Sequence, residues 1–272
     1  MLLVANLTFL ALSGTPPQTE PAHTDQAWTI LKDGVGNKNA EKRTKAVQAL
    51  ALLSANRRAE EMAQNMLSDP SPVVRAAAAT ALGQMGDISA RAKLRNALDD
   101  REAKVVIAAA NALYALKDPV AYDVYYALLT GERKGSSGLL HSELNTLKDR
   151  REVERLAFET GIGFVPFGGM GWEAWKTVTK DDTSPVRAAA AEKLAHDPDP
   201  MSAEALSNAC SDRKWRVRVA AVDAIAKRGD PALLHSLEPL LTDGNDSVRF
   251  RTAAAVIRLS WITDDRRRAR PN

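Results

Sequence analysis

Residues 69–82 read Asp-Pro-Ser-Pro-Val-Val-Arg-Ala-Ala-Ala-Ala-Thr-Ala-Leu, and related stretches recur along the chain. Five copies open on an aspartate, at steps of 31, 81, 31 and 31 residues: Asp69, Asp100, Asp181, Asp212 and Asp243. In four copies a valine-arginine pair follows, with the arginine six residues after the aspartate: Arg75, Arg187, Arg218 and Arg249. A weaker sixth copy begins near Asn37, with Arg43 in the arginine position. Repetition at such a period predicts a solenoid of stacked units.

Each copy contains two segments with the spacing of amphipathic helices. Residues 74–82 place alanine and aliphatic side chains on one helical face, and Gly83 and Gly86 are expected to end this helix. Residues 88–98 carry a second apolar face. Residues 212–242 follow the same plan. The composition, 45% apolar with only 5% aromatic residues, also favours helix over strand. We therefore predict an all-α solenoid of about six helix pairs.

The repeat resembles the HEAT family, and most closely its short-repeat branch named for the phycobilisome lyases. The resemblance rests on the Asp-x-x-x-x-Val-Arg opening, the alanine run and the Gly-Asp break, and it covers residues 30–130 and 181–260. It implies an armadillo-type superhelix in which the repeated aspartates and arginines form a structural ladder of hydrogen bonds: Asp69, Arg75, Asp181, Arg187, Asp212, Arg218, Asp243 and Arg249. The fold hosts scaffolds, lyases and nucleic-acid enzymes alike, so it does not by itself define a function.

The step of 81 residues exceeds one period by 50 residues and so marks an insertion. The predicted organisation has five parts: an N-terminal signal and linker (1–24), N-terminal repeats (25–130), the insertion (131–180), C-terminal repeats (181–260) and a basic tail (261–272). The last copy lacks a second helical segment after Ser260, so either the tail caps the array or a partner covers it.

The insertion contains an unusual loop, residues 161–175, with five glycines, two phenylalanines and two tryptophans. Three interpretations stay open. The loop covers helix faces exposed by the interruption, or it docks a protein or peptide partner, or it contacts a membrane surface. Its glycine spacing matches no nucleotide-binding loop. The candidate partner-binding residues here are Phe164, Phe167, Trp172 and Trp175.

The N-terminus bears on localisation. Residues 2–12 form a short apolar run, followed by small residues and a proline-containing stretch, which is the order of parts in a secretory signal. This pattern predicts export to the periplasm or the medium. The alternative is an N-terminal helix packed on the first repeat of a cytoplasmic protein.

Positive charge is concentrated near the C-terminus. Residues 213–272 contain 13 Lys or Arg against 7 Asp or Glu, a net charge of +6, whereas the whole chain carries +3. Trp215, Arg216 and Arg218 form a basic and aromatic group that is a further candidate for partner binding. Ordinary solvated surface is the alternative. Nucleic acid is the less favoured partner, because the overall charge is modest.

Catalytic patterns are absent from the sequence. The four histidines stand apart without a His-Glu pair, and Cys210 lies in an apolar helical pattern that predicts a buried small side chain. We predict neither a metal site nor a cofactor. The expected function is a non-catalytic scaffold for protein–protein interaction. The alternatives are a lyase or isomerase acting on a protein-bound chromophore, as the resemblance implies, and a DNA-contacting protein.

Overall fold

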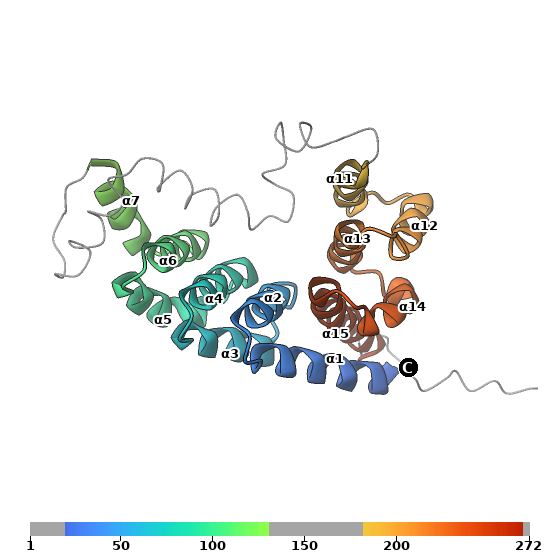
Figure 1. Cartoon of the computed structure of the whole chain (residues 1–272), viewed down its shortest axis with the longest axis horizontal. Coiled ribbons are helices and arrows are strands. Elements are labelled where there is room, and N and C mark those ends of the chain that lie inside the picture. The colour runs from blue at the N-terminus through green and yellow to red at the C-terminus, as the bar shows by residue number, and fades with distance from the viewer. Residues whose placement is uncertain (1–19, 131–181, 269–272) are drawn as a thin grey trace, which may run out of the picture.

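The computed structural model describes residues 20–130 and 182–268 (Figure 1). Within these two ranges every regular element is a helix, as the sequence predicts. None of these helices is both long enough and apolar enough to cross a membrane.

The first described range holds seven α-helices: α1 (Glu20–Val35), α2 (Ala40–Leu50), α3 (Arg57–Asn65), α4 (Pro72–Met85), α5 (Arg91–Asn96), α6 (Ala103–Ala115) and α7 (Val120–Thr130). The second holds five: α11 (Ser184–Leu194), α12 (Pro200–Ala209), α13 (Trp215–Arg228), α14 (Leu234–Leu237) and α15 (Asp246–Arg268). Short 3₁₀ turns extend the second helices of the repeats: η1 (Met66–Ser68), η2 (Ile88–Ala90), η3 (Ala97–Asp99), η6 (Pro231–Leu233) and η7 (Glu238–Thr242).

Glycine positions set the helix ends and one close contact. Gly86 and Gly229 end α4 and α13 in the left-handed conformation, with φ of 74° and 66°. Gly83, predicted to help end α4, instead lies inside it. A Cβ atom at Gly83 would stand 2.7 Å from the Cα atom of Ala112, so glycine is needed there for the close approach of α4 and α6.

The order of the helices in space differs from their order in the chain. One layer of the array runs α11, α13, α15, α2, α4, α6, and it lines the concave side of an arc (Figure 1). The outer helices form a second layer on the convex side of these. Helix α12 packs against α11 and α13, α14 and α1 pack against α15, α3 packs against α2 and α4, and α5 and α7 pack against α6. The two ends of the described chain therefore meet in the middle of the solenoid.

Helix α1 provides the second helix that the last copy lacks. It packs against α15 as well as α2, so neither the C-terminal tail nor a partner covers this face of α15. Residues 261–268, at the start of the predicted basic tail, continue α15. With α1 in this place the array has six helix pairs in the described ranges, which agrees with the predicted number.

The contact between α1 and α15 is close and mostly apolar. Leu31 on α1 is fully buried. A Cβ atom at Gly34 would lie 2.6 Å from the ring of Phe250 on α15 and 2.7 Å from Cβ of Ala46 on α2. Glycine at this position thus lets three helices from the two halves of the chain converge.

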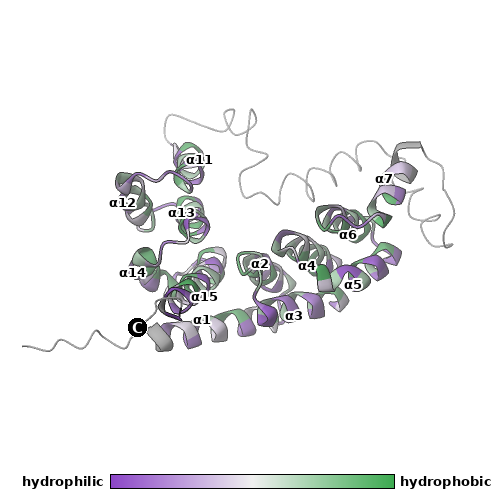
Figure 2. Cartoon of the chain, turned by 180° about the vertical axis from the view of Figure 1, so that it is seen from behind, coloured by the Kyte–Doolittle hydropathy of each residue, from purple (hydrophilic) through white to green (hydrophobic). Residues whose placement is uncertain are grey.

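Small side chains fill the inner layer and larger ones fill the space beneath it. The alanine runs of α4, α6, α13 and α15 are buried, and the outer segments contribute leucines such as Leu94 and Leu237. Figure 2 shows α4 and α6 largely hydrophobic, whereas α3 and α5 are largely hydrophilic on the outer side. Alanines allow the inner helices to approach one another closely.

Candidate functional site

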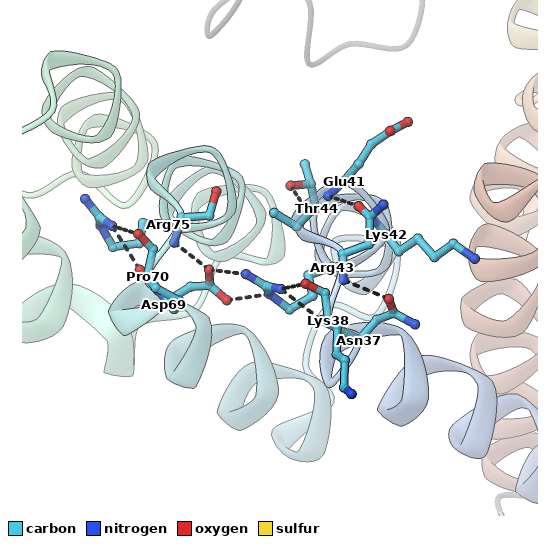
Figure 3. Close-up of polar contacts among 12 residues, drawn as sticks. Asn37, Lys38, Glu41, Lys42, Arg43, Thr44, Asp69, Pro70 and Arg75 are labelled. Atoms are coloured by element: carbon cyan, nitrogen blue, oxygen red, sulfur yellow. Dashed lines mark hydrogen bonds and ion pairs between the residues drawn. The ribbon is translucent and has the colours of Figure 1, made fainter.

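Arginines of the inner layer link one repeat to the next at every described step except that from α15 to α2. Arg43 of α2 donates from Nε and Nη2 to the two carboxylate oxygens of Asp69, both at 2.8 Å (Figure 3). Its Nη1 donates to the carbonyl oxygen of Asn37 in its own repeat, also at 2.8 Å. Oδ1 of Asp69 in turn accepts a hydrogen bond from the backbone amide of Ser71 at 2.8 Å, which fixes the turn before α4. One rung therefore joins two repeats and sets a helix start.

The forked pair recurs in both halves of the chain, with Nε to Oδ2 distances of 2.7 to 3.0 Å: Arg75–Asp100, Arg187–Asp212 and Arg218–Asp243. Asp181, predicted as part of the ladder, lies outside the described residues. Burial alone would raise the pKa of Asp69, but the hydrogen bonds from Arg43 and from the Ser71 amide hold this pKa below its ordinary value. The carboxylate of Asp69 is thus stabilised in its charged form.

The rung changes where α15 meets α2. Nη1 of Arg249 donates to the carbonyl of Asp243 at 2.7 Å, as Arg43 and Arg218 do in their repeats, but its Nη2 donates to Asp246 in the same helical turn. The aspartate position of the next repeat in space is occupied by Asn37, which has no negative charge to offer. Asn37 keeps only the local role, because its Oδ1 accepts the backbone amide of Asn39 at 3.0 Å.

Other polar contacts cross this junction instead. Nζ of Lys42 on α2 lies 3.6 Å from Asp246 on α15. Arg258 of α15 donates from Nε to the carbonyl of Ala226 at 2.9 Å and from Nη1 to the carbonyl of Leu52 at 3.2 Å. Arg258 therefore connects α13, α15 and the turn after α2.

A cleft lies at this junction on the concave layer, where the column of α11, α13 and α15 meets the row of α2, α4 and α6 (Figure 1). Its volume is about 330 Å³. We call it the elbow cleft and define it by six side chains from four helices: Gln48, Gln84, Asp223, Lys227, Arg251 and Arg258. It brings together residues of the two halves that stand far apart in the sequence.

The elbow cleft has an internal ion pair and an excess of positive charge. Nη1 of Arg251 donates to both oxygens of Asp223, at 2.8 and 2.7 Å, and the Asp223 carboxylate is nearly fully buried. Lys227 is exposed and has no ion pair with any residue that the structure describes. The nearby carboxyl of Glu192 on α11 has its pKa raised by burial, which the positive charge of Lys227 partly offsets.

The predicted aromatic and basic candidates lie elsewhere. Trp215, at the start of α13, is 40% exposed, and the guanidinium carbon of Arg216 lies 5.2 Å from the centre of its ring. Arg218 belongs to the ladder, where Asp243 and two backbone carbonyls accept its hydrogen bonds. The remaining candidates lie outside the described residues: Phe164, Phe167, Trp172 and Trp175.

Two features of the structure were not predicted from the sequence. The elbow cleft is one, because its residues come from distant copies and no motif unites them. The other is an aromatic group on α6 and α7, in which Tyr114 makes edge contacts with Tyr122 and Tyr125, each with 5.7 Å between ring centres. All four tyrosines of the chain fall within residues 114–126, and this clustering was a signal available from the sequence.

In the part of the chain that the structure describes, the reactive side chains do not converge on a centre. Cys210 is buried, as predicted, and burial raises its pKa to about 12, so its thiol is protonated at neutral pH. No group of three or more His, Cys, Asp or Glu side chains suited to a metal ion occurs within residues 20–130 and 182–268.

Stacked helical hairpins, an arginine-aspartate ladder and a polar cleft on the concave layer define an α-solenoid repeat protein. The family model for HEAT repeats matches residues 29–115, 61–133 and 173–258. Together these matches cover more than half of the chain, and the protein belongs to the HEAT-repeat family. No curated protein matches the sequence.

Solved structures with a similar course of the chain share little sequence with it. The complex of CpcE and CpcF of phycocyanin lyase from Nostoc sp. PCC7120 is 18% identical, with a TM-score of 0.33, over 93% of this chain and 100% of that one. Human deoxyhypusine hydroxylase is 18% identical, with a TM-score of 0.30, over 89% and 96%. An engineered protein is 16% identical, with a TM-score of 0.30, over 88% and 97%.

Proposed function

We propose that this protein is a non-catalytic scaffold that binds another protein along the concave layer of its solenoid. The observation that supports this proposal best is the elbow cleft, where polar side chains from four helices face a common space at the strongest bend of the array. Concave surfaces of solenoids offer a continuous area for partner binding.

The distribution of hydrogen bonds also favours the concave layer. Along the ladder, the arginine and aspartate groups bond to one another and to backbone groups. In the cleft, by contrast, the amides of Gln48 and Gln84 form no hydrogen bond with any described residue. A partner can bind there without first breaking an intramolecular contact, and its own polar groups can replace the water that these amides lose.

Site-specific photocrosslinking would test the proposal. A photoreactive benzoylphenylalanine at Gln84, on the concave layer, should crosslink one protein of defined mass in extract of the native host. The same residue at Lys93, an exposed position on α5 of the outer layer, should give no such product. Crosslinking from Lys93 alone, or from neither position, would contradict binding along the concave layer.

The aromatic loop provides a second arm of the test. If residues 161–175 dock the partner, replacing Phe164, Phe167 and Trp172 with serine should abolish capture in a pull-down while helical content stays near the wild-type value. Unchanged capture would reject the loop as a docking element. It would leave the crosslink at Gln84 as the measure of concave binding.

Export remains part of the proposal, and fractionation of the native host checks it by showing which compartment holds the mature chain. A lyase or isomerase activity and contact of the loop with a membrane stay predictions of the sequence. Contact with DNA predicts salt-sensitive retention on DNA that is lost when Arg216 and Arg218 are replaced by glutamate.

A further inference from the structure

The charge balance of the elbow cleft indicates the chemistry of its ligand. Three cationic side chains, Lys227, Arg251 and Arg258, line the cleft together with one carboxylate, Asp223. Even when the neighbouring Glu192 is counted as ionised, three positive charges stand against two negative ones. A site with this balance attracts an anion.

The cationic groups retain free donors. A guanidinium carries five N–H donors. Arg258 uses Nε and Nη1 for two backbone carbonyls, and Arg251 uses Nη1 for both of its bonds to Asp223. Nη2 of each arginine has no acceptor in the part of the chain that the structure describes. The contacts already made hold both guanidinium groups in place, so little side-chain entropy is lost when an anion binds.

The opposite wall of the cleft suits a peptide backbone. Gln48 of α2 and Gln84 of α4 each present an amide that can both donate and accept hydrogen bonds. Those are the two functions that an extended peptide needs from its binding site. A volume of about 330 Å³ is at the lower end of the range for ligand pockets, which fits one or two residues of a chain better than a large cofactor.

We propose that the elbow cleft binds an acidic segment of a partner protein, with an Asp or Glu carboxylate between Lys227 and Arg258 and the adjoining peptide backbone against Gln48 and Gln84. This inference rests on the proposed scaffold function and specifies the partner's chemistry. Lys227 gives recognition of charge, and the rigid arginines give direction to the hydrogen bonds.

Two lysines provide a matched test. Lys227 and Lys93 are both exposed and both lie in the last turn of their helices, but only Lys227 is in the cleft. Fluorescein-labelled hexaglutamate should bind the full chain at low salt, as measured by anisotropy, and hexaglutamine should bind at least tenfold more weakly. Lys227→Glu should weaken hexaglutamate binding at least tenfold, Lys93→Glu less than twofold, and Lys227→Arg should retain most of the affinity. Thermal melts of all three variants check that the fold is unchanged.

The remaining outcomes of this binding experiment would overturn or reassign the proposal. Equal losses for Lys227→Glu and Lys93→Glu would show general attraction to a basic surface and overturn the proposal. Equal binding of hexaglutamine would overturn it as well. Tighter binding of a labelled thymidine dodecamer, lost in Lys227→Glu, would assign the cleft to phosphate groups instead. If hexaglutamate does not bind while the photocrosslink at Gln84 persists, the acidic peptide is wrong and the scaffold function stands. If both fail, the scaffold function fails too.

Discussion

Neighbouring repeats are held together in one way at the regular step from α2 to α4 and in another way at the junction of α15 and α2. Between α2 and α4 the two repeats are joined by the chain itself and by the forked pair of Arg43 with Asp69. At the step from α15 to α2 the chain also joins the repeats, because α1 leads directly into α2, but the pair of α15 and α1 is itself made from two distant parts of the chain. The rung is absent from this step because Asn37 replaces the aspartate. Scattered contacts take over, among them Lys42–Asp246 and the bond from Arg258 to Leu52.

The difference shows that stacking depends on complementary apolar faces more than on chain order. Helix α1 fills the outer position beside α15 although the two lie at opposite ends of the described chain, and Thr24 of α1 hydrogen-bonds Ser260 at 3.1 Å across 236 residues. In a solenoid each unit contacts only its neighbours, so any helix with the right face can complete a repeat. The junction also contains the elbow cleft.

Removing α1 should cause the largest loss of stability, because α1 is the helix that completes the junction. A chain that starts at residue 37 would expose the apolar face of α15 that Leu31 and its neighbours cover. Burial of several apolar side chains contributes about 5 kcal/mol. For an array of this size we expect the melting temperature to fall by roughly 10–20 °C.

Circular dichroism melts would measure the effect of this truncation. A synthetic peptide of residues 20–36, added in excess, should restore part of the stability because it binds only the folded form. A truncated chain that melts like the full one would show that α1 is dispensable and that the junction is not a sixth repeat.

Two glycines allow the regular step and the junction to be compared by the same substitution. Gly83→Ala places a methyl group 2.7 Å from the backbone Cα of Ala112, so α6 must shift, and we expect a loss of about 3 kcal/mol. At Gly34 the nearest atoms are in the ring of Phe250, which can turn, and Cβ of Ala46, which moves only with the backbone of α2, so Gly34→Ala should cost about 2 kcal/mol. Urea denaturation of both variants tests the ranking. An equal or larger loss at Gly34 would mean that the junction is as rigid as a regular step.

The repeats could be predicted from the sequence, because each depends on local signals. The helical faces, Gly86 and Gly229 all act within a few residues of the boundaries they set. The place of α1 could not be predicted, because residues 20–36 carry no Asp-Arg signature and pack against a helix more than 200 residues away. The sequence showed that the last copy lacks a second helix. It did not show that the N-terminal helix α1 takes that position.

The elbow cleft was unpredictable for a related reason. Gln48 and Lys227 come together because the array bends at α15, where α1, α2 and α15 converge around Gly34. The spacing of the repeats in the sequence predicts which helices are neighbours within one half of the chain. It does not predict which helices meet between the two halves.

Removing the rung from a regular step, so that it resembles the junction, should cause an intermediate loss of stability. Asp69→Asn keeps the turn, since an amide oxygen can accept the Ser71 amide as Asn37 does for Asn39, but it leaves the guanidinium of Arg43 without its carboxylate. Both partners are largely buried, so we expect a loss of about 2 kcal/mol. Asp212→Asn is the matched control and should cost less than about 1 kcal/mol, because the side chain of Arg187 is 43% exposed.

The pH dependence of the same variant follows from the lowered pKa of Asp69. A carboxyl with a lower pKa in the folded state contributes stability that is fully present above its unfolded pKa of about 3.9 and is lost as the pH falls through the folded pKa. The stability difference between wild type and Asp69→Asn should therefore be constant from pH 7 to about 5 and shrink below pH 4. A difference that does not change in acid would assign the loss to packing.

Restoring the rung at the α15–α2 step should cause the smallest change in stability. It is also the most direct test of how the junction differs from a regular step. Asn37→Asp places a carboxylate in the aspartate position of the repeat that follows α15, where Arg249 now turns back to Asp246. A restored rung between partly exposed groups should add about 0.5–1 kcal/mol. A double-mutant cycle with Arg249→Gln, followed by urea denaturation, isolates the pair, because the gain should vanish when the guanidinium is absent. A gain that persists without Arg249 would mean that the new carboxylate acts on the turn before α2 alone. The α15–α2 step would then differ from the others in geometry as well as in charge.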